Sequence, residues 1–170
     1  MNKKQYKTKK GTYSLPAVYY TDKHGYFSVD EPTKNGKIKC YLPKQDTSKT
    51  VNIDALDKVA IIREENPLDL KINDIYNIAA GSQKLSFTVA SVEDNKLILK
   101  CTGTGKNTQI TIEFSVVSFS AFIKQLQKEG YSVNVTAANT NESNNKSIWI
   151  IGGIVGIGVV TYLITKKKNE

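Results

Sequence analysis

The amino-acid sequence predicts an α+β fold, with a β-rich head of mainly antiparallel sheet, one or two amphipathic helices, and a single C-terminal transmembrane helix. Apolar and polar residues alternate between positions 84 and 116, which is typical of half-buried strands. From 119 to 126 the apolar residues recur with the spacing of an amphipathic helix. Residues 148–165 then form a run of 18 residues without a charge, long enough to cross a bilayer.

The strands of the second half are the most clearly patterned. A hairpin is predicted because two alternating segments flank the turn-forming residues 93–96, with Leu85, Phe87, Val89, Leu97, Leu99 and Cys101 facing inward. A third strand follows, whose inward residues are Ile110, Ile112, Phe114 and Val116.

The pattern then changes to a helix of about three turns. Its apolar face consists of Phe119, Phe122, Ile123 and Leu126. Ser118 or Ser120 is the expected N-cap, and Gly130 is the expected stop. Tyr131, Val133 and Val135 alternate again, so a last strand returns to the sheet.

In the first half, strands are predicted at residues 13–20, 26–29, 37–42, 50–53 and 59–62, with Pro16 placing the first on a sheet edge. Residues 67–80 fit a helix and, in part, a strand; the helix is favoured because Gly81 suits its end. The predicted head covers residues 12–136, with a possible subdomain break at 64–67.

The net charge of +8 is unevenly distributed. Residues 1–50 contain eleven lysines and four acidic residues. Residues 1–11 are predicted to be a disordered basic arm, because the lysines repel one another and only one aromatic residue accompanies them. Such an arm could bind an anionic lipid surface or a nucleic acid through Lys3, Lys4, Lys7, Lys9 and Lys10.

The membrane anchor is predicted at residues 147–165, after a polar linker at 137–146 and before a basic tail at 166–170. The 18 uncharged residues at 148–165 would span about 27 Å as a helix, close to the hydrocarbon thickness of about 30 Å. Aromatic residues near both ends and lysines after it are typical of an anchor: Trp149, Tyr162, Lys166, Lys167 and Lys168. Gly152 and Gly156 form a GxxxG pair that would allow two helices to associate into a homo-oligomer.

The protein is predicted to be oriented in the membrane with its head in the cytoplasm. No apolar stretch follows the N-terminal lysines, so no cleaved signal peptide is expected. Two lysines lie within 20 residues before the apolar segment and three lie after it, which slightly favours the opposite orientation. The absence of a signal peptide outweighs that margin.

No catalytic, cofactor-binding or metal-ligating pattern is found. Cys40 and Cys101 are far apart and are in phase with apolar neighbours, so buried free thiols are favoured over a disulfide. His24 lies in a turn without a nucleophile paired to it in the sequence. Residues 101–110 differ from a phosphate-binding loop, because Lys100 stands where the first glycine belongs and a strand follows.

The favoured function is therefore a non-enzymatic, single-pass membrane-anchored interaction or scaffold protein, whose partners are the lipid bilayer and another protein. The layout of head, polar stalk, apolar span and lysine tail is similar to that of many small membrane proteins of low-GC bacteria and their phages. A structural membrane protein of a virus particle, linking lipid to capsid or genome, is one alternative. A membrane-tethered enzyme with an unrecognised site is the other.

Overall fold

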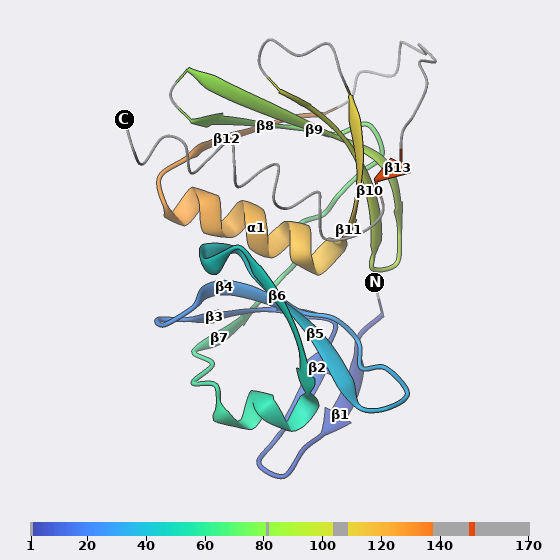
Figure 1. Ribbon diagram of the computed structural model, residues 1–170, viewed down its shortest axis with the longest axis vertical. Helices are drawn as coiled ribbons and strands as arrows, with labels where there is room; N and C mark the ends of the chain where they lie inside the picture. The colour runs from blue at the N-terminus through green and yellow to red at the C-terminus, as the bar shows by residue number, and fades with distance from the viewer. Residues whose placement is uncertain (1, 81, 104–108, 138–149, 152–170) are drawn as a thin grey trace. The chain divides into compact units, whose positions relative to one another are not determined.

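The computed structural model describes residues 2–80, 82–103, 109–137 and 150–151 (Figure 1). It is β-rich, with antiparallel sheets and one α-helix among these residues, as the alternating patterns predicted. The chain divides into two compact units: unit 1 is Met1–Asp69 with Ser115–Gln125, and unit 2 is Leu70–Phe114 with Leu126–Glu170. The first boundary lies a few residues after the break expected at residues 64–67.

Unit 1 begins with a hairpin rather than with the disordered arm that the lysines suggested. β1 (Lys4–Lys7) pairs antiparallel with β2 (Thr12–Leu15). Tyr6 lies opposite Tyr13, and both rings pack against the core of the unit. The expectation of disorder at residues 4–7 is wrong because distant carboxylates offset the lysine charges and Tyr6 has apolar surface to contact.

The main sheet of unit 1 has five antiparallel strands in the order β6-β5-β4-β3-β7 (Figure 1). Their bounds are β3 (Ala17–Thr21), β4 (Gly25–Val29), β5 (Lys37–Leu42), β6 (Thr47–Asn52) and β7 (Arg63–Glu65). Two 3₁₀ helices, η1 (Pro43–Gln45) and η2 (Ile53–Lys58), lie on either side of β6 in the sequence.

Two expected strands differ from the observed ones. The strand predicted at residues 13–20 is split at Pro16 into β2 and β3, and β3 is an inner strand rather than an edge. The strand predicted at 59–62 is instead β7, a few residues later. The reason is that η2 extends to Lys58, and Val59 ends this 3₁₀ helix by donating its backbone N–H to Leu56 O.

The core of unit 1 lies against one face of this sheet. It consists of Leu15, Ala17, Tyr19, Phe27, Val29, Ile38, Cys40, Leu42 and Leu56. Ile38, Cys40 and Leu42 alternate along β5, as their sequence spacing predicted. Cys40 is a buried free thiol, and burial, with a smaller contribution from the Asp30 charge, raises its pKa to about 11.

Helix α1 (Val116–Lys128) follows β11 (Ile110–Ser115) without an intervening loop. Its N-cap is Ser115, whose Oγ accepts the backbone N–H of Ser118, so the expected caps Ser118 and Ser120 lie inside the helix. Gly130 ends the helix as predicted. Its φ is +85°, its N–H bonds Gln127 O, and the next N–H bonds Leu126 O, which is a Schellman motif.

Within unit 1, the helix packs on β3 and β4. Val117 and Ala121 form a buried cluster with Val18, and Tyr26 packs against it. Next to this cluster Ser118 Oγ hydrogen-bonds Ser28 Oγ at 2.9 Å. The helix thus contacts the sheet through small apolar residues and satisfied polar groups.

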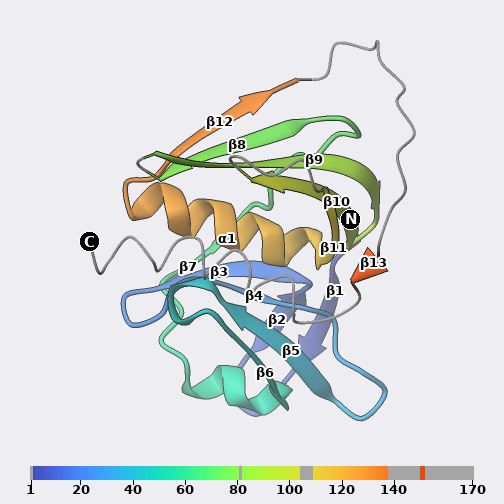
Figure 2. The same ribbon diagram turned by 45° about the horizontal axis from the view of Figure 1, so that its top comes forward.

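The sheet of unit 2 has the strand order β12-β8-β9-β10-β11-β13 (Figure 2). Its other members are β8 (Ile75–Ala80), β9 (Gln83–Glu93), β10 (Lys96–Gly103), β12 (Ser132–Thr136) and β13 (Ile150–Ile151). The predicted hairpin is confirmed: Lys96 pairs with Glu93. The turn passes through Asp94, whose φ is +49°.

The buried residues of β9, β10 and β11 follow the predicted alternation: Leu85, Phe87, Val89, Leu97, Leu99, Cys101 and Ile112. Tyr76 and Ile78 of β8 are buried as well, in a segment for which a helix was favoured. Cys101 is a buried free thiol as expected, and burial raises its pKa to about 11.

The helix favoured at residues 67–80 is wrong. Asn73 has a φ of +70°, which interrupts any helix there, and β8 begins two residues later. The backbone at Asn73 and Asp74 is instead hydrogen-bonded to β9. The Asn73 N–H donates to Val89 O, and the Val89 N–H donates to Asp74 O. Ile72, expected on the apolar face of that helix, is 56% exposed.

The predicted transmembrane segment lies almost entirely outside the described residues. Ile150 and Ile151 form β13, which pairs in parallel with Thr111 and Ile112 of β11, so these two residues are extended and not helical. In the described parts of the chain, no helix has the length and hydrophobicity that a membrane crossing requires.

Candidate interaction surfaces

Two of the five lysines of the predicted basic arm are paired with carboxylates of unit 1. Lys3 forms an exposed ion pair with Glu64, and Lys4 Nζ lies 3.2 Å from Glu31 Oε2. Lys7 ends β1, whereas Lys9 and Lys10 lie in the turn to β2. The charges of Lys3 and Lys4 are thus compensated, which weakens the expected attraction of this segment to an anionic partner.

The turn between β1 and β2 is held by Asp57 of η2. Asp57 accepts hydrogen bonds from Thr8 Oγ1 at 2.5 Å, from Lys10 N–H at 3.1 Å and from Tyr13 OH at 3.1 Å. These bonds, the Thr8 bond most of all, lower the pKa of Asp57. A carboxylate with three donors has little capacity left for a ligand, so Asp57 acts as a structural clamp.

The predicted anchor residues Trp149, Gly152, Gly156, Tyr162, Lys166, Lys167 and Lys168 lie outside the described residues. Their roles remain predictions.

An aromatic and cationic cluster lies on unit 1 where β3, β4, β7 and α1 meet. The Arg63 guanidinium is 4.3 Å from the centroid of the Tyr20 ring, and Arg63 Nη2 donates to Tyr26 OH at 3.3 Å. The Tyr20 and Tyr26 rings are 5.0 Å apart between centroids. We call Tyr20, Tyr26 and Arg63 the tyrosine–arginine cluster.

Glu65 fixes the arginine of this cluster. It accepts from Arg63 Nε at 2.6 Å, and Lys124 Nζ of α1 lies 3.5 Å from its other oxygen. The Arg63 hydrogen bond is the main reason that the pKa of Glu65 is lowered. Arg63 keeps half of its side chain exposed, so its guanidinium is oriented in advance yet accessible from solvent.

A second surface lies around His24 in the turn between β3 and β4. His24 Nδ1 lies 3.0 Å from Gln45 Nε2 of η1. The pKa of His24 is lowered, first by partial burial and then by the charges of Lys23, Lys49 and Lys44. The His24–Gln45 contact was not predicted, because the two residues come from separate segments that only the fold brings together.

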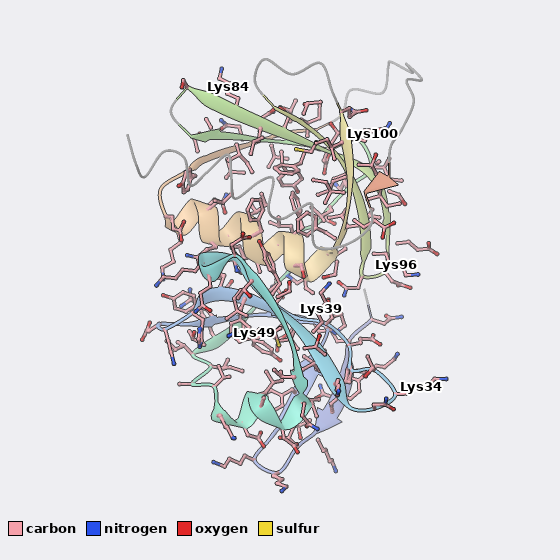
Figure 3. The ribbon with its side chains drawn as sticks, viewed as in Figure 1. Lys34, Lys39, Lys49, Lys84, Lys96 and Lys100 are labelled. Atoms are coloured by element: carbon pink, nitrogen blue, oxygen red, sulfur yellow. The ribbon has the colours of Figure 1, made fainter. Side chains whose placement is uncertain are left out.

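The third surface is the face of the unit 2 sheet opposite its buried side chains. It is polar and rich in hydroxyl and amide groups, and Ser86 Oγ donates to Asn77 Oδ1 at 2.6 Å across β9 and β8. Lys84, Lys96 and Lys100 are on β9 and β10 of this sheet (Figure 3). Glu93 lies opposite Lys96, so the lysine charge is locally balanced.

No group of three or more potential metal ligands occurs among the described residues. Comparisons with protein-family models, with curated proteins and with solved structures find no significant match to this chain.

Proposed function

We propose that this chain is a non-enzymatic, single-pass membrane protein that holds a β-rich head at a membrane surface and binds another protein there. The observation that carries the proposal is the run of 18 uncharged residues at 148–165, with lysines directly after it. The polar linker at 137–146 supports it, because such a tether separates the head from the bilayer.

The proposal requires β13 to give way when the segment inserts. A helix that began only after Ile151 would have 14 residues up to Thr165 and would reach about 21 Å, short of the hydrocarbon thickness. The two-residue pairing of β13 with β11 stabilises the strand by roughly 1–3 kcal/mol, at about 0.5–1.5 kcal/mol per hydrogen bond. The ten Ile, Val and Leu residues of the segment favour insertion by roughly 3–6 kcal/mol, partly offset by its glycines and threonines.

The anchor is tested by Val155→Lys, which places a charge near the middle of the segment. A central lysine costs about 2.5–3.5 kcal/mol, a large part of the insertion energy. We expect the variant to leave the carbonate-washed membrane pellet, whereas Asn169→Lys, which adds the same charge outside the segment, should remain there. A Val155→Lys protein that stays in the pellet would contradict the anchor.

Truncation after Lys146 separates the anchor from a role of this segment in the fold. We expect a soluble protein with the β-rich circular dichroism and the cooperative unfolding of the full chain. An aggregated or unfolded product would instead indicate that β13 and the residues after it complete the sheet of unit 2.

The tyrosine–arginine cluster is the surface that we propose for the protein partner. Tyrosine and arginine are enriched among the residues that dominate binding energy, and here Glu65 holds the arginine in place before binding. A photo-cross-linking amino acid at Tyr20 should give a discrete adduct in native membranes, and the same group at Asn35, between β4 and β5, should not. Equal adducts from both positions would exclude this surface.

The proposed orientation places the head in the cytoplasm. Protease added to intact cells should then leave residues 1–136 undigested, and detergent lysis should expose them. Digestion without lysis would reverse the orientation.

A further inference from the structure

Arg63 is held in one orientation by three neighbours within unit 1. Its Nε donates to Glu65 Oε1 at 2.6 Å, its Nη2 donates to Tyr26 OH at 3.3 Å, and its guanidinium carbon lies 4.3 Å from the centroid of the Tyr20 ring. The strand register explains why these groups meet, because Tyr20 of β3 lies opposite both Arg63 of β7 and Tyr26 of β4. The three side chains of the tyrosine–arginine cluster therefore stand side by side on one face of neighbouring strands.

The guanidinium keeps donors that no described residue uses. A guanidinium has five N–H donors in a planar fork. Within the described residues, Arg63 donates only to Glu65 and to Tyr26, which leaves three of its N–H groups without an acceptor there. Half of the Arg63 side chain is exposed, so a partner can approach these donors from solvent.

Tyr26 adds a further donor at the same place. Its phenol oxygen accepts from Arg63 Nη2, and a phenol can donate its own proton at the same time. That proton has no acceptor in the part of the chain that the structure describes. Unused donors of Arg63 and Tyr26 thus lie next to each other, and a carboxylate can accept from two such donors through its two oxygens.

The charge at this site favours a singly charged acceptor. Glu65 lies between Arg63 and Lys124, 2.6 Å from Arg63 Nε and 3.5 Å from Lys124 Nζ, so the three groups sum to one positive charge. Glu64, the residue between Arg63 and Glu65 in β7, is paired with Lys3 and adds no net charge. One carboxylate would neutralise the site, whereas a phosphate dianion would exceed its charge and repel the Glu65 carboxylate.

We propose that the partner protein presents an aspartate or glutamate side chain, whose carboxylate docks on Arg63 and Tyr26. The carboxylate assignment rests on the proposed function, because it names the group that the tyrosine–arginine cluster recognises. The partner carboxylate accepts from the free Nη donors of Arg63 and from the O–H of Tyr26. Since Glu65 and the Tyr20 ring already hold the guanidinium, docking requires little further ordering of Arg63.

Arg63 is the only arginine in the chain, so its Nε–H group gives a single signal in magnetic resonance. We would titrate the full chain in phosphatidylcholine nanodiscs with a short capped peptide that carries one glutamate between two phenylalanines. The matched control peptide has glutamine in place of the glutamate. We expect the glutamate peptide to shift the Arg63 signal saturably and to bind about ten-fold more tightly than the control, because a charged acceptor makes the stronger hydrogen bond. Equal binding of the two peptides would overturn the carboxylate site.

Inorganic phosphate at matched ionic strength tests the competing anion. We expect phosphate to shift the Arg63 signal less than the glutamate peptide does, and without saturation. A saturable shift with phosphate at equal or lower concentration would overturn the proposal, because it would indicate a general anion site that a lipid or nucleic-acid phosphate could fill.

A matched pair of variants separates the proposed contact from a general charge effect. Arg63→Lys keeps the positive charge and loses the planar fork, and Lys34→Gln removes a charge from the exposed loop before β5 (Figure 3). Fluorescence anisotropy of the labelled glutamate peptide should show binding weakened about ten-fold by Arg63→Lys and unchanged by Lys34→Gln. Equal effects of the two variants would contradict the docking site.

Tyr26→Phe provides a second test if Arg63→Lys disturbs the fold. It keeps the ring and removes only the O–H donor, so it should weaken binding of the glutamate peptide by about three-fold. Tyr131→Phe, which removes a hydroxyl outside the cluster, should leave binding unchanged. Unaltered binding by Tyr26→Phe would contradict the role of this hydroxyl in the site.

The photo-cross-link at Tyr20 separates failure of the carboxylate site from failure of the proposed function. An adduct on a partner segment that contains an acidic residue supports both. An adduct on a segment without one contradicts the carboxylate site and leaves the binding surface in place. Absence of an adduct contradicts the proposed surface, and the peptide titration then decides the carboxylate site independently.

Discussion

Gln125 Oε1 in α1 accepts a hydrogen bond at 2.9 Å from the backbone N–H of Tyr26, a residue 99 positions earlier in the chain. Gln125 is almost fully buried, with 3% of its surface exposed. A helix side chain thus satisfies a main-chain donor at the start of β4, where the strand begins after its turn. Buried donors are costly to leave unpaired, so this contact ties the helix to the sheet.

Gln125→Leu should destabilise the protein by about 1–3 kcal/mol, because the variant removes the acceptor and leaves the Tyr26 N–H buried and unpaired. Chemical denaturation of the full chain in detergent measures the change. Gln127→Leu is the matched control, since Gln127 is exposed in the same helix, and it should change stability by less than about 0.5 kcal/mol. Equal effects would show that the Gln125 hydrogen bond contributes nothing specific.

Gly25→Ala should be more destabilising than Gly36→Ala. Both glycines have a φ of +69°, and a side chain in that region costs about 1–3 kcal/mol. A Cβ at Gly25 would also collide with Gln125 Oε1, whereas a Cβ at Gly36 meets nothing within 4 Å. The difference between the two unfolding free energies measures the collision, and it should vanish if Gln125 is not placed against the turn.

Asp57→Ala should loosen the β1–β2 turn, because Thr8, Lys10 and Tyr13 lose a common acceptor. The lysines of this turn then become sites of faster cleavage by a lysine-specific protease, which mass spectrometry of the fragments detects. Asp54→Ala serves as the control, since Asp54 is exposed and its carboxylate makes no hydrogen bond with a described residue. Unchanged cleavage at Lys9 and Lys10 would be inconsistent with the clamp.

The same carboxylate makes the turn sensitive to acid. The folded state lowers the pKa of Asp57 below its ordinary value of 3.8, so the folded protein binds fewer protons than the unfolded one in this range. The stabilisation is therefore complete above pH 3.8 and is lost as the pH falls through the lower, folded pKa. Hydrogen exchange of the Lys10 amide should accelerate in that range for the natural protein, and Asp57→Ala should remove the transition.

Native Cys40 and Cys101 should react very slowly with iodoacetamide at pH 8. Both thiols are buried and their pKa values are raised to about 11, so little thiolate exists and the reagent cannot reach it. In denaturant without reductant both should be alkylated fully, adding two labels by mass. Failure to label in denaturant would instead indicate a disulfide.

In β9 and β10, the alternation of apolar and polar residues was sufficient to predict the strands. Leu85, Phe87 and Val89 face the core of unit 2 as their alternation implied, and Gly130 ends α1 as expected. The helix predicted at residues 67–80 was wrong because a helical spacing is shared only by coincidence among Leu68, Ile72, Ile75 and Ala79. What decides the outcome there is the positive φ of Asn73 and its bond to Val89, a contact that no local pattern contains.

The prediction for the lysine-rich N-terminal segment was wrong for a similar reason. Lysine repulsion predicted disorder for the N-terminus, but Glu31, Asp57 and Glu64, all distant in sequence, provide its partners. The contact between His24 and Gln45 was missed because 21 positions separate the two residues, and only the meeting of the β3–β4 turn with η1 makes them neighbours. Surfaces assembled from separate elements are beyond the reach of a single sequence read without homologues.

The direct passage from β11 into α1 at Ser115 limits how the length of this chain can vary in evolution. An inserted residue between Ser115 and Val116 would rotate the helix by about 100° relative to its cap. Val117 and Ala121 would turn away from Val18, and Ser118 from Ser28. Insertions and deletions should therefore be tolerated in the loop before β5, around Lys34, but selected against at this junction.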